Sequence, residues 1–274
     1  MNLHLLRKTL LAFFLASRLA TATEPEEREL VLDLGGNVTL KVIKIPAGKF
    51  LMGSAISEWE HQGIEGLLNA REGEARVEVT LTKPFFMGIH EVTVAQYQRF
   101  CEETKTEHKT AGIPQTGEHP VVNVTWENCI AFCAWLTKKS GRTASLPTEA
   151  QWEYACRAGT TTGFSFGDKV QELGDYAWFK ENAEGSTHPV GLKKPNAWGL
   201  YDMHGNAWEW CSDLYAEGGL TTAVDPTGAT KGGLRIRRGG GWADIPRACR
   251  SAFRGRAVPD ASMWRGFRVT VAAQ

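Results

Sequence analysis

The sequence predicts an α+β domain with sparse regular secondary structure, and three observations support this prediction. Short alternating strands occupy the N-terminal part, three short helices with recognisable cap residues follow, and a segment dense in Gly, Trp, Asp and Asn begins after Gly159. The chain has 274 residues, of which 42% are hydrophobic and 23% are charged. This length accommodates one large domain or two small ones, and we find no internal repeat.

Residues 1–22 have the pattern of a signal peptide. Arg7 and Lys8 precede an apolar stretch at residues 9–16, and the small residues at 20–22 suit cleavage. A membrane anchor is the alternative, but this stretch is shorter than the roughly 20 residues that span a bilayer. We therefore expect export to the periplasm or the extracellular space, with no integral membrane segment in the mature chain.

The charge balance gives no reason to expect a nucleic-acid partner. The full chain has 31 basic and 31 acidic residues. Residues 1–22 contain three basic residues and no acidic ones, so 28 basic and 31 acidic residues remain, a net charge of −3. A basic surface is the usual signature of nucleic-acid binding, and the mature chain lacks that excess.

The strands of the N-terminal part follow from alternation and turn residues. Residues 23–37 are acidic and then turn-like, which predicts a linker into the domain. Apolar and polar side chains alternate along residues 38–45, as they do in a half-buried strand. Residues 45–50 are predicted to form a strand, a turn and a second strand. Residues 55–75 predict a surface loop, and the alternation at residues 77–81 predicts the next strand.

Three threonines mark the starts of the predicted helices. Thr93 and Thr148 each precede a glutamine by three positions, which is the spacing of a capping box, and Thr125 caps the helix between them. The second helix would bury an apolar stripe of Cys129, Phe132, Cys133 and Leu136.

The last strands are expected at residues 235–238 and 266–271.

The six cysteines favour buried or bridged thiols. An even number in an oxidising compartment is typical of disulfides. Cys129 and Cys133 lie four positions apart on a predicted helix, which is one possible metal spacing. The chain has no CxxC pair and no HxH or HxxxH spacing to support a metal there.

Seven segments, in order along the chain, match one protein family. They are VIKIPAGKFLMGS (42–54), HEVT (90–93), HPVVNVTW (119–126), LPTEAQWEYA (146–155), PNAWGLYDMHGNAWEW (195–210), RGGGW (238–242) and RGFRV (265–269). Over residues 38–271 the chain resembles the formylglycine-generating enzyme family, also called sulfatase-modifying factors. The resemblance implies a compact α+β fold related to C-type lectins.

Active members of that family oxidise a substrate cysteine to formylglycine with copper held by two cysteines, because two thiolates suit copper(I). Those cysteines lie between the Arg-Gly-Gly motif and a later arginine, which correspond here to residues 238–254. Counted without gaps, the two positions hold Asp244 and Cys249. Only one cysteine occurs in the segment, so the resemblance implies that the copper pair cannot form there.

Cys249 has two interpretations. It is either a lone reactive thiol, the catalytic residue of an altered oxidase, or one half of a disulfide with Cys156. Cys156 follows the Trp-Glu-Tyr block, as a bridging cysteine does in the family. In an exported chain the disulfide is favoured, and it would stabilise the fold by ~4 kcal/mol in the chain-entropy treatment.

The resemblance also implies a structural calcium ion, because hard oxygen ligands suit calcium. The ligands would be the side chains of Asp202 and Glu209 and the carbonyl oxygens of Gly205 and Ala207. Alternatively, these acids cap turns and pair with arginines. A second calcium site of the family would use carbonyls near Trp178 and Phe179, where this chain is shortened and lacks the expected aspartate.

Three functions are compatible with these residues. The favoured one is a binding or accessory domain that keeps the fold, has lost the oxidase and binds a protein or peptide in the former substrate groove. A sulfatase is the partner that the resemblance suggests. The second is a copper-dependent formylglycine-generating oxidase with altered cysteines, and the third is another enzyme with Asp244 as acid or base. The anchors of the binding groove would be Trp242, Asp244, Arg247, Arg254 and Trp264.

Overall fold

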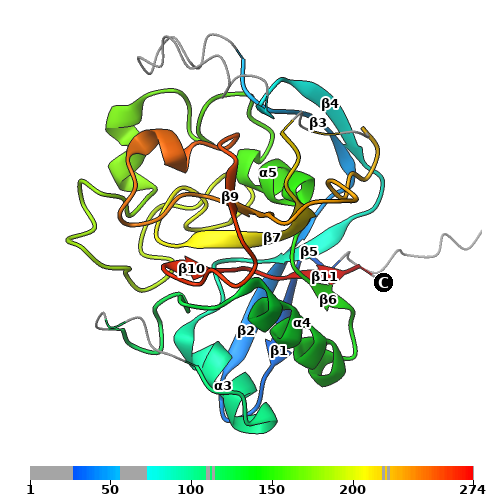
Figure 1. The fold of residues 1–274 in the computed structure, drawn as a ribbon, viewed down its shortest axis with the longest axis vertical. Helices are drawn as coiled ribbons and strands as arrows, with labels where there is room; N and C mark the ends of the chain where they lie inside the picture. Colours follow the sequence, from blue (N-terminus) through cyan, green and yellow to red (C-terminus); the bar gives the residue numbers. More distant parts are fainter. Residues whose placement is uncertain are drawn as a thin grey trace, which may run out of the picture.

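The computed structural model describes residues 27–55, 73–108, 112, 115–217, 220 and 223–273. The predicted signal peptide and most of the predicted loop at residues 55–75 lie outside these ranges. The described chain forms two sheets, a two-stranded pair and three α-helices, which confirms the predicted α+β class (Figure 1). No helix in these ranges is both long enough and apolar enough to cross a bilayer.

The first sheet joins both ends of the described chain. All of its neighbouring strands pair antiparallel, and the C-terminal strand lies between strands from earlier in the sequence. The domain is thereby closed by its own C-terminus. The strand order is β1 (Glu29–Asp33), β2 (Thr39–Ile45), β5 (Phe85–Gly88), β11 (Thr270–Ala272) and β6 (Ala144–Ser145).

Strand β1 corrects the linker predicted at residues 23–37. Leu30 and Leu32 are buried while the residues beside them are exposed, which is the two-residue period of a half-buried strand. Val31 pairs with Lys41 of β2, so this segment belongs to the sheet. The acidic residues on its exposed face gave the segment the composition of a linker. Residues 23–26 lie outside the described ranges.

The three helices start at the predicted threonines. Thr93, Thr125 and Thr148 are the N-cap residues, and each forms a complete capping box with the side chain three positions later. Each box satisfies two main-chain donors at the helix start, which explains why these local signals were sufficient. The helices are α3 (Val94–Thr104), α4 (Trp126–Ser140) and α5 (Glu149–Arg157).

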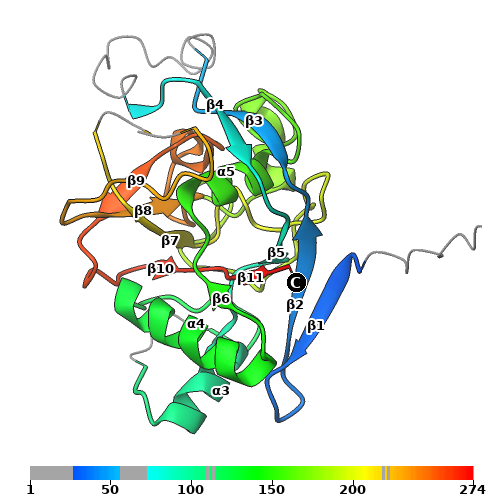
Figure 2. The same cartoon turned by 90° about the vertical axis from the view of Figure 1, so that its right-hand side faces the viewer.

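Helices α3 and α4 pack together at one end of the molecule, beside β1 and β2 (Figures 1 and 2). The predicted stripe of α4 is buried in full, together with Trp135. Phe132 is the centre of this aromatic core, because its ring lies 5.9 Å from Tyr97, 5.7 Å from Phe100 and 5.2 Å from Phe267. Phe267 belongs to the C-terminal segment, so this core also fixes the end of the chain.

The second sheet lies on the other side of that C-terminal segment. The predicted strand at 235–238 is confirmed as β8, whereas the strand predicted at 266–271 is divided. It divides because the segment pairs first with β7 and then with β5. The strand order is β10 (Arg265–Gly266), β7 (Trp208–Leu214), β8 (Arg235–Arg238) and β9 (Gly255–Ala257), and the separate pair is β3 (Gly48–Met52) with β4 (Val77–Leu81).

The chain between α5 and β7 has little regular structure, as predicted. Its regular element in the described ranges is the 3-10 helix η1 (Val170–Asp175), and a similar turn, η2 (Pro246–Cys249), follows β8. The side chain of Asn206 accepts a hydrogen bond from the His188 main-chain N–H and donates one to its carbonyl, which fixes the turn before β7. Asp202 lies in that turn, near the buried Glu209 of β7.

Candidate functional site

Three buried carboxylates and one guanidinium form a group that we call the acid cluster. Glu209 lies on β7, Asp202 lies in the turn before it, and Glu91 lies between β5 and α3. Arg268 lies between β10 and β11, and all four side chains are buried. Three negative charges against one positive charge leave the ionised cluster with a net charge of −2, which is costly inside a protein unless it is compensated.

Glu209 is fully paired within the acid cluster. Arg268 donates Nε to Oε2 and Nη2 to Oε1, both over 2.7 Å. The indole Nε1 of Trp152 donates to Oε2 over a further 2.7 Å. This is a bidentate arginine–carboxylate pair. The alternative to calcium binding, in which the acids pair with arginines, is therefore realised at Glu209.

Glu91 and Asp202 are the unsatisfied members of the acid cluster. Among the described residues neither oxygen of Glu91 has a hydrogen-bond partner, and neither does Oδ1 of Asp202. Oδ2 of Asp202 accepts the Gly191 N–H over 2.7 Å. Burial raises the pKa of Asp202 to about 6, and burial with the charges of Asp202 and Glu209 raises the pKa of Glu91 well above its usual value. These orphaned oxygens need either a proton or a cation.

The turn that carries the predicted calcium ligands is tightly constrained. At Gly205 a Cβ atom would lie 2.3 Å from the Trp178 carbonyl oxygen, so only glycine fits. That oxygen already accepts the Asn206 N–H over 2.8 Å. No three Asp, Glu, His or Cys side chains within the described ranges are arranged to hold a metal. A calcium ion here would therefore also need main-chain oxygens, as the predicted Gly205 and Ala207 carbonyls would provide.

Cys249 and Asp244 lie near each other but do not form a reactive pair. Cys249 in η2 is fully buried, and burial followed by the Asp244 charge raises the pKa of its thiol far above the usual value. Oδ2 of Asp244 accepts hydrogen bonds from Trp208 Nε1 over 2.7 Å and from the Gly241 N–H over 3.0 Å. The thiol is therefore kept protonated, and the carboxylate is held by two donors.

The expected disulfide between Cys156 and Cys249 is absent from the structure, where all six cysteines are free. The Cys156 sulfur lies 3.6 Å from Ser251 Oγ and 3.8 Å from the Met203 carbonyl oxygen. The Cys249 sulfur lies beneath Gly240, where an added Cβ atom would approach it to 2.9 Å. Each thiol thus occupies its own packed environment.

Two of the five predicted anchors form an aromatic pair. The rings of Trp242 and Trp264 meet edge to face, with centroids 5.0 Å apart, and Trp264 is 40% exposed. Arg247 lies near Phe253, with 5.9 Å from its Cζ to the ring centroid, and Phe253 in turn lies 6.0 Å from the Trp208 ring. Asp244 accepts the Trp208 indole N–H, so Asp244 contacts Trp208 directly and Arg247 reaches that ring only through Phe253.

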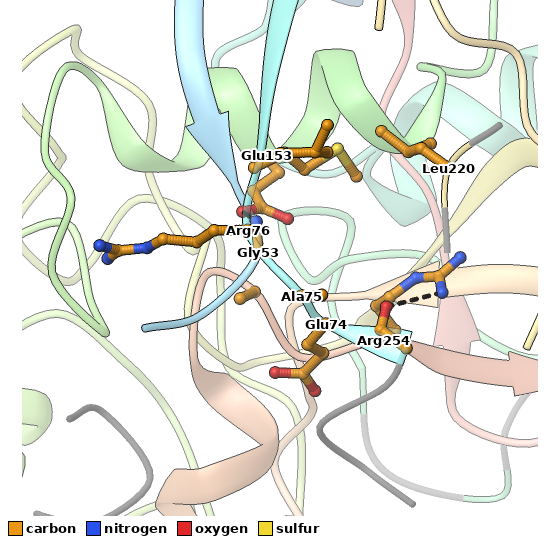
Figure 3. A pocket seen from close by; sticks show the side chains of 11 residues that line it. Gly53, Glu74, Ala75, Arg76, Glu153, Leu220 and Arg254 are labelled. Atoms are coloured by element: carbon orange, nitrogen blue, oxygen red, sulfur yellow. Dashed lines mark hydrogen bonds between the residues drawn. The ribbon is translucent and has the colours of Figure 1, made fainter. Parts of the chain in front are cut away.

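Arg254, the fifth predicted anchor, has a structural role elsewhere. Its guanidinium pairs with both carboxylate oxygens of Glu149 over 2.7 and 2.9 Å and also donates to the Gly73 carbonyl. It lines a cavity of about 150 Å³ together with Glu74 and Glu153, shown in Figure 3. None of the other four predicted anchors lines that cavity.

Arg237 and Arg265 are two basic residues that sequence reasoning missed. Arg237 on β8 stacks on Trp208, with its Cζ 3.9 Å from the ring centroid. Arg265 on β10 is in register with Trp208 on β7. We call these residues and the aromatic pair the arginine–tryptophan face, which comprises Trp208, Arg237, Trp242, Trp264 and Arg265.

A family model for the "Sulfatase-modifying factor enzyme 1-like domain" matches residues 33–273. The chain belongs to the sulfatase-modifying factor family. It is 28% identical over 291 aligned positions to a formylglycine-generating enzyme of Bos taurus, covering 83% of this chain and 74% of the relative. It is also 28% identical to an "Inactive C-alpha-formylglycine-generating enzyme 2" of the same organism, covering 78% of this chain and 80% of the relative.

A solved structure confirms the fold of this family member. Treponema denticola variable protein 1 superposes with a TM-score of 0.76 at 26% identity, covering 91% of this chain and all of that one. The chain is thus similar both to a relative named as a formylglycine-generating enzyme and to a relative named as inactive. Membership alone leaves both an oxidase role and an accessory role open, and the site residues must be considered individually.

The residues missed by the sequence reasoning share one property, which is that their importance depends on tertiary neighbours. Glu91 stands in the HEVT motif, but only the fold places it beside Asp202 and Glu209 without a partner. Arg237 had a weak signal, because the period of a strand puts its side chain on the face opposite to the apolar Ile236. Reading that alternation would have marked Arg237 as a surface residue beside the aromatic motif.

Proposed function

We propose that this chain is an exported binding or accessory member of the sulfatase-modifying factor family that has lost the two-cysteine copper site. The observation that carries the proposal is the state of Cys249 and Asp244. A copper(I) site of the family type needs two thiolates, and residues 238–254 contain one sulfur. That sulfur is fully buried, and its raised pKa keeps it protonated.

The contacts of Asp244 argue against an acid–base enzyme at this position. Its carboxylate accepts two hydrogen bonds, from Trp208 and Gly241. The charges that act on it are those of Arg237 and Arg265, which stay protonated and are poor proton acceptors. Asp244 therefore supports the arginine–tryptophan face, which would bind a protein or peptide ligand.

Export and partner choice complete the proposal. The signal-peptide pattern of residues 1–22 supports export. Because the matching family is described as sulfatase-modifying, a sulfatase is the first partner to test. A second candidate function, formylglycine generation from a substrate cysteine, is favoured by the relatives of that name.

We also infer a structural calcium ion at the acid cluster. The orphaned oxygens of Asp202 and Glu91 are hard donors, and a divalent cation would offset the net charge of −2. The carbonyls of Gly205 and Ala207 would supply further oxygens, while Glu209 is oriented by Arg268. Bound calcium would supply charge compensation and would tie the turn before β7 to the segment between β5 and α3.

A copper(I) titration tests the loss of the oxidase site. The protein would compete with a chromophoric copper(I) chelator, and we expect no high-affinity equivalent to be retained. Asp244→Cys restores the second thiol and is expected to gain copper(I) binding. Retention by the natural protein that is lost in Cys249→Ser, but kept in the control Cys101→Ser, would instead support the oxidase.

A further inference from the structure

We propose that Arg237 and Arg265 bind the carboxylate of an acidic side chain in a peptide ligand whose neighbouring residues are apolar. This inference rests on the proposed binding function and names the ligand chemistry of the same face. The five residues of the arginine–tryptophan face come from β7, β8, β10 and the loops next to them, so the site is built on the second sheet.

The donors of the two arginines are largely unused. Among the described residues Arg237 has no hydrogen-bond acceptor and no ion pair, and its main contact is the stack on Trp208. Arg265 donates to one acceptor, the Met263 carbonyl, over 3.0 Å. The Nε atoms of both arginines are buried without a partner, as is the indole Nε1 of Trp242. A buried donor without an acceptor costs free energy, but the described chain has others at Arg99, Arg238 and Arg247, so this observation supports the site only together with the stack and the charges.

The charge on this face is uncompensated. Burial, followed by the nearby charge of Arg265, lowers the pKa of Arg237 to about 10, and burial lowers the pKa of Arg265. Asp244 is the carboxylate that acts on both, and its Oδ2 is already shared by Trp208 and Gly241. Two guanidinium groups against one carboxylate leave one positive charge, which an anionic ligand would neutralise.

The positions of the two guanidinium groups are set by rigid elements. At Gly255 on β9 an added Cβ atom would lie 2.7 Å from the Trp208 ring and 2.8 Å from Arg237 Cγ, so glycine makes room for the stack. Arg265 is tied to β7 by the parallel pairing with Trp208. A preorganised guanidinium loses little conformational entropy on binding a carboxylate, which favours a specific site.

The surroundings of the arginines distinguish a peptide from a small ion. Met263 is 62% exposed and Trp264 40% exposed, and both directly precede Arg265 in the chain. Ile245, next to Asp244, is 53% exposed. Exposed apolar side chains beside a charged centre suit a ligand that buries apolar neighbours around its acid. Inorganic anions offer the charge but no apolar surface.

The test uses three pools of labelled short peptides with a central Glu, Gln or Lys flanked by mixed Leu, Phe, Val and Tyr. Binding of each pool to the full calcium-loaded chain would be measured by fluorescence anisotropy. We expect the Glu pool to bind at least about tenfold more tightly than the Gln pool, which corresponds to about 1.4 kcal/mol. The Lys pool should bind more weakly than either.

Variants then assign the effect to the two arginines. Arg237→Gln and Arg265→Gln should each abolish the preference for Glu over Gln, whereas the control Arg256→Gln, an exposed arginine on β9, should retain it. Thermal melting would verify that each variant is folded. Equal binding of the Glu and Gln pools, or no binding of either, would overturn the inference. Full displacement of the Glu pool by low-millimolar inorganic sulfate would also overturn it, in favour of a small-anion site.

These outcomes are separable from the proposed function. A protein that binds Glu and Gln pools equally remains a binding domain without the acid specificity. Retention of copper(I) through Cys249 would overturn the binding proposal whatever the peptide preference.

Discussion

The acid cluster and the arginine–tryptophan face are electrostatic opposites within one domain. The acid cluster is buried and has unused acceptors, because Glu91 and Asp202 keep orphaned oxygens beside the satisfied Glu209. The arginine–tryptophan face is partly exposed and has unused donors on Arg237 and Arg265. An acceptor surplus in the interior is relieved by protons or by a cation, and we propose a calcium ion that belongs to the fold. A donor surplus at the surface is suited to an anion that arrives with a partner.

The largest expected change in the free energy of unfolding concerns the buried acid cluster. Arg268→Met removes the guanidinium that pairs with Glu209 and leaves three buried carboxylates without compensation. We expect a loss of about 3–5 kcal/mol in the free energy of unfolding, measured by urea denaturation in calcium-free buffer. The exposed control Arg256→Met, which loses a hydrogen bond and a stack to Tyr215, should lose no more than about 1 kcal/mol. A loss below about 1 kcal/mol for Arg268→Met would mean that the acids are already neutral in the fold.

Calcium is expected to distinguish the two regions, because the proposed ion binds at the acid cluster and not at the arginine–tryptophan face. With free calcium at about 100 times its dissociation constant, the free energy of unfolding should rise by about 2.7 kcal/mol, and a chelator should reverse the change. Glu91→Gln should leave the metal-free protein at least as stable and reduce the calcium-dependent increment. The exposed control Glu118→Gln should keep the whole increment. A calcium-independent melting temperature would contradict the proposed ion.

A buried acid outside the acid cluster, Asp213, provides a reference for which no cation is proposed. Asp213 on β7 faces Glu149, Arg238 and Ser212, and burial followed by the Glu149 charge raises its pKa to about 7. The folded state therefore binds this proton more tightly than the unfolded state, whose carboxyl pKa is about 4. Stability from this group is present at low pH and falls as pH rises from about 4 to 7, by at most about 1.4 kcal/mol per pH unit.

Asp213→Asn tests that assignment in urea titrations across the same pH range. The amide can still accept the Glu149 N–H, so the variant should unfold with a flatter pH profile and be more stable than the natural protein above pH ~7. An unchanged profile would assign the pH dependence to other groups.

The smallest expected stability change lies on the exposed side. Arg237→Gln removes a stack on Trp208 and relieves repulsion from Arg265, so its cost should be no more than about 1 kcal/mol. Urea denaturation of Arg237→Gln and of Arg268→Met in parallel would compare the losses in free energy of unfolding of the two variants. A loss similar to that of Arg268→Met would show that Arg237 is a structural residue, and the arginine–tryptophan face would lose its central member.

Local chemistry explains which parts of this molecule were predictable. The capping boxes at Thr93 and Thr148 and the stripe of α4 depend on residues within one helical turn or two, so sequence spacing was enough. Strand β1 was missed because acidic residues masked its alternation. The division of residues 266–271 between two sheets depends on distant partners.

The candidate site was predicted in part for the same reason. The motif of Asp202 and Glu209 led to the turn that the fold places in the acid cluster, and the aromatic motif led to Trp242, which pairs with Trp264. Calcium binding at the turn and ligand binding at Trp242 stay predictions. Glu91 lies more than a hundred residues from its neighbours in the acid cluster, and Arg237 gains its meaning only from the ring beneath it. The pairing of Arg254 with Glu149 was not predicted, because the two residues lie far apart in the sequence.

The most direct test of the central claim uses a Cys-x-Pro-x-Arg peptide, the substrate motif that the resemblance to formylglycine-generating enzymes implies. Conversion of its cysteine by the calcium- and copper(I)-loaded mature chain would be followed by mass spectrometry. We predict that the cysteine remains unmodified while the same sample shows calcium-dependent melting, which demonstrates an intact fold. Conversion to formylglycine that is lost in Cys249→Ser and kept in Cys101→Ser would contradict the account and establish an oxidase that works with one cysteine in this segment.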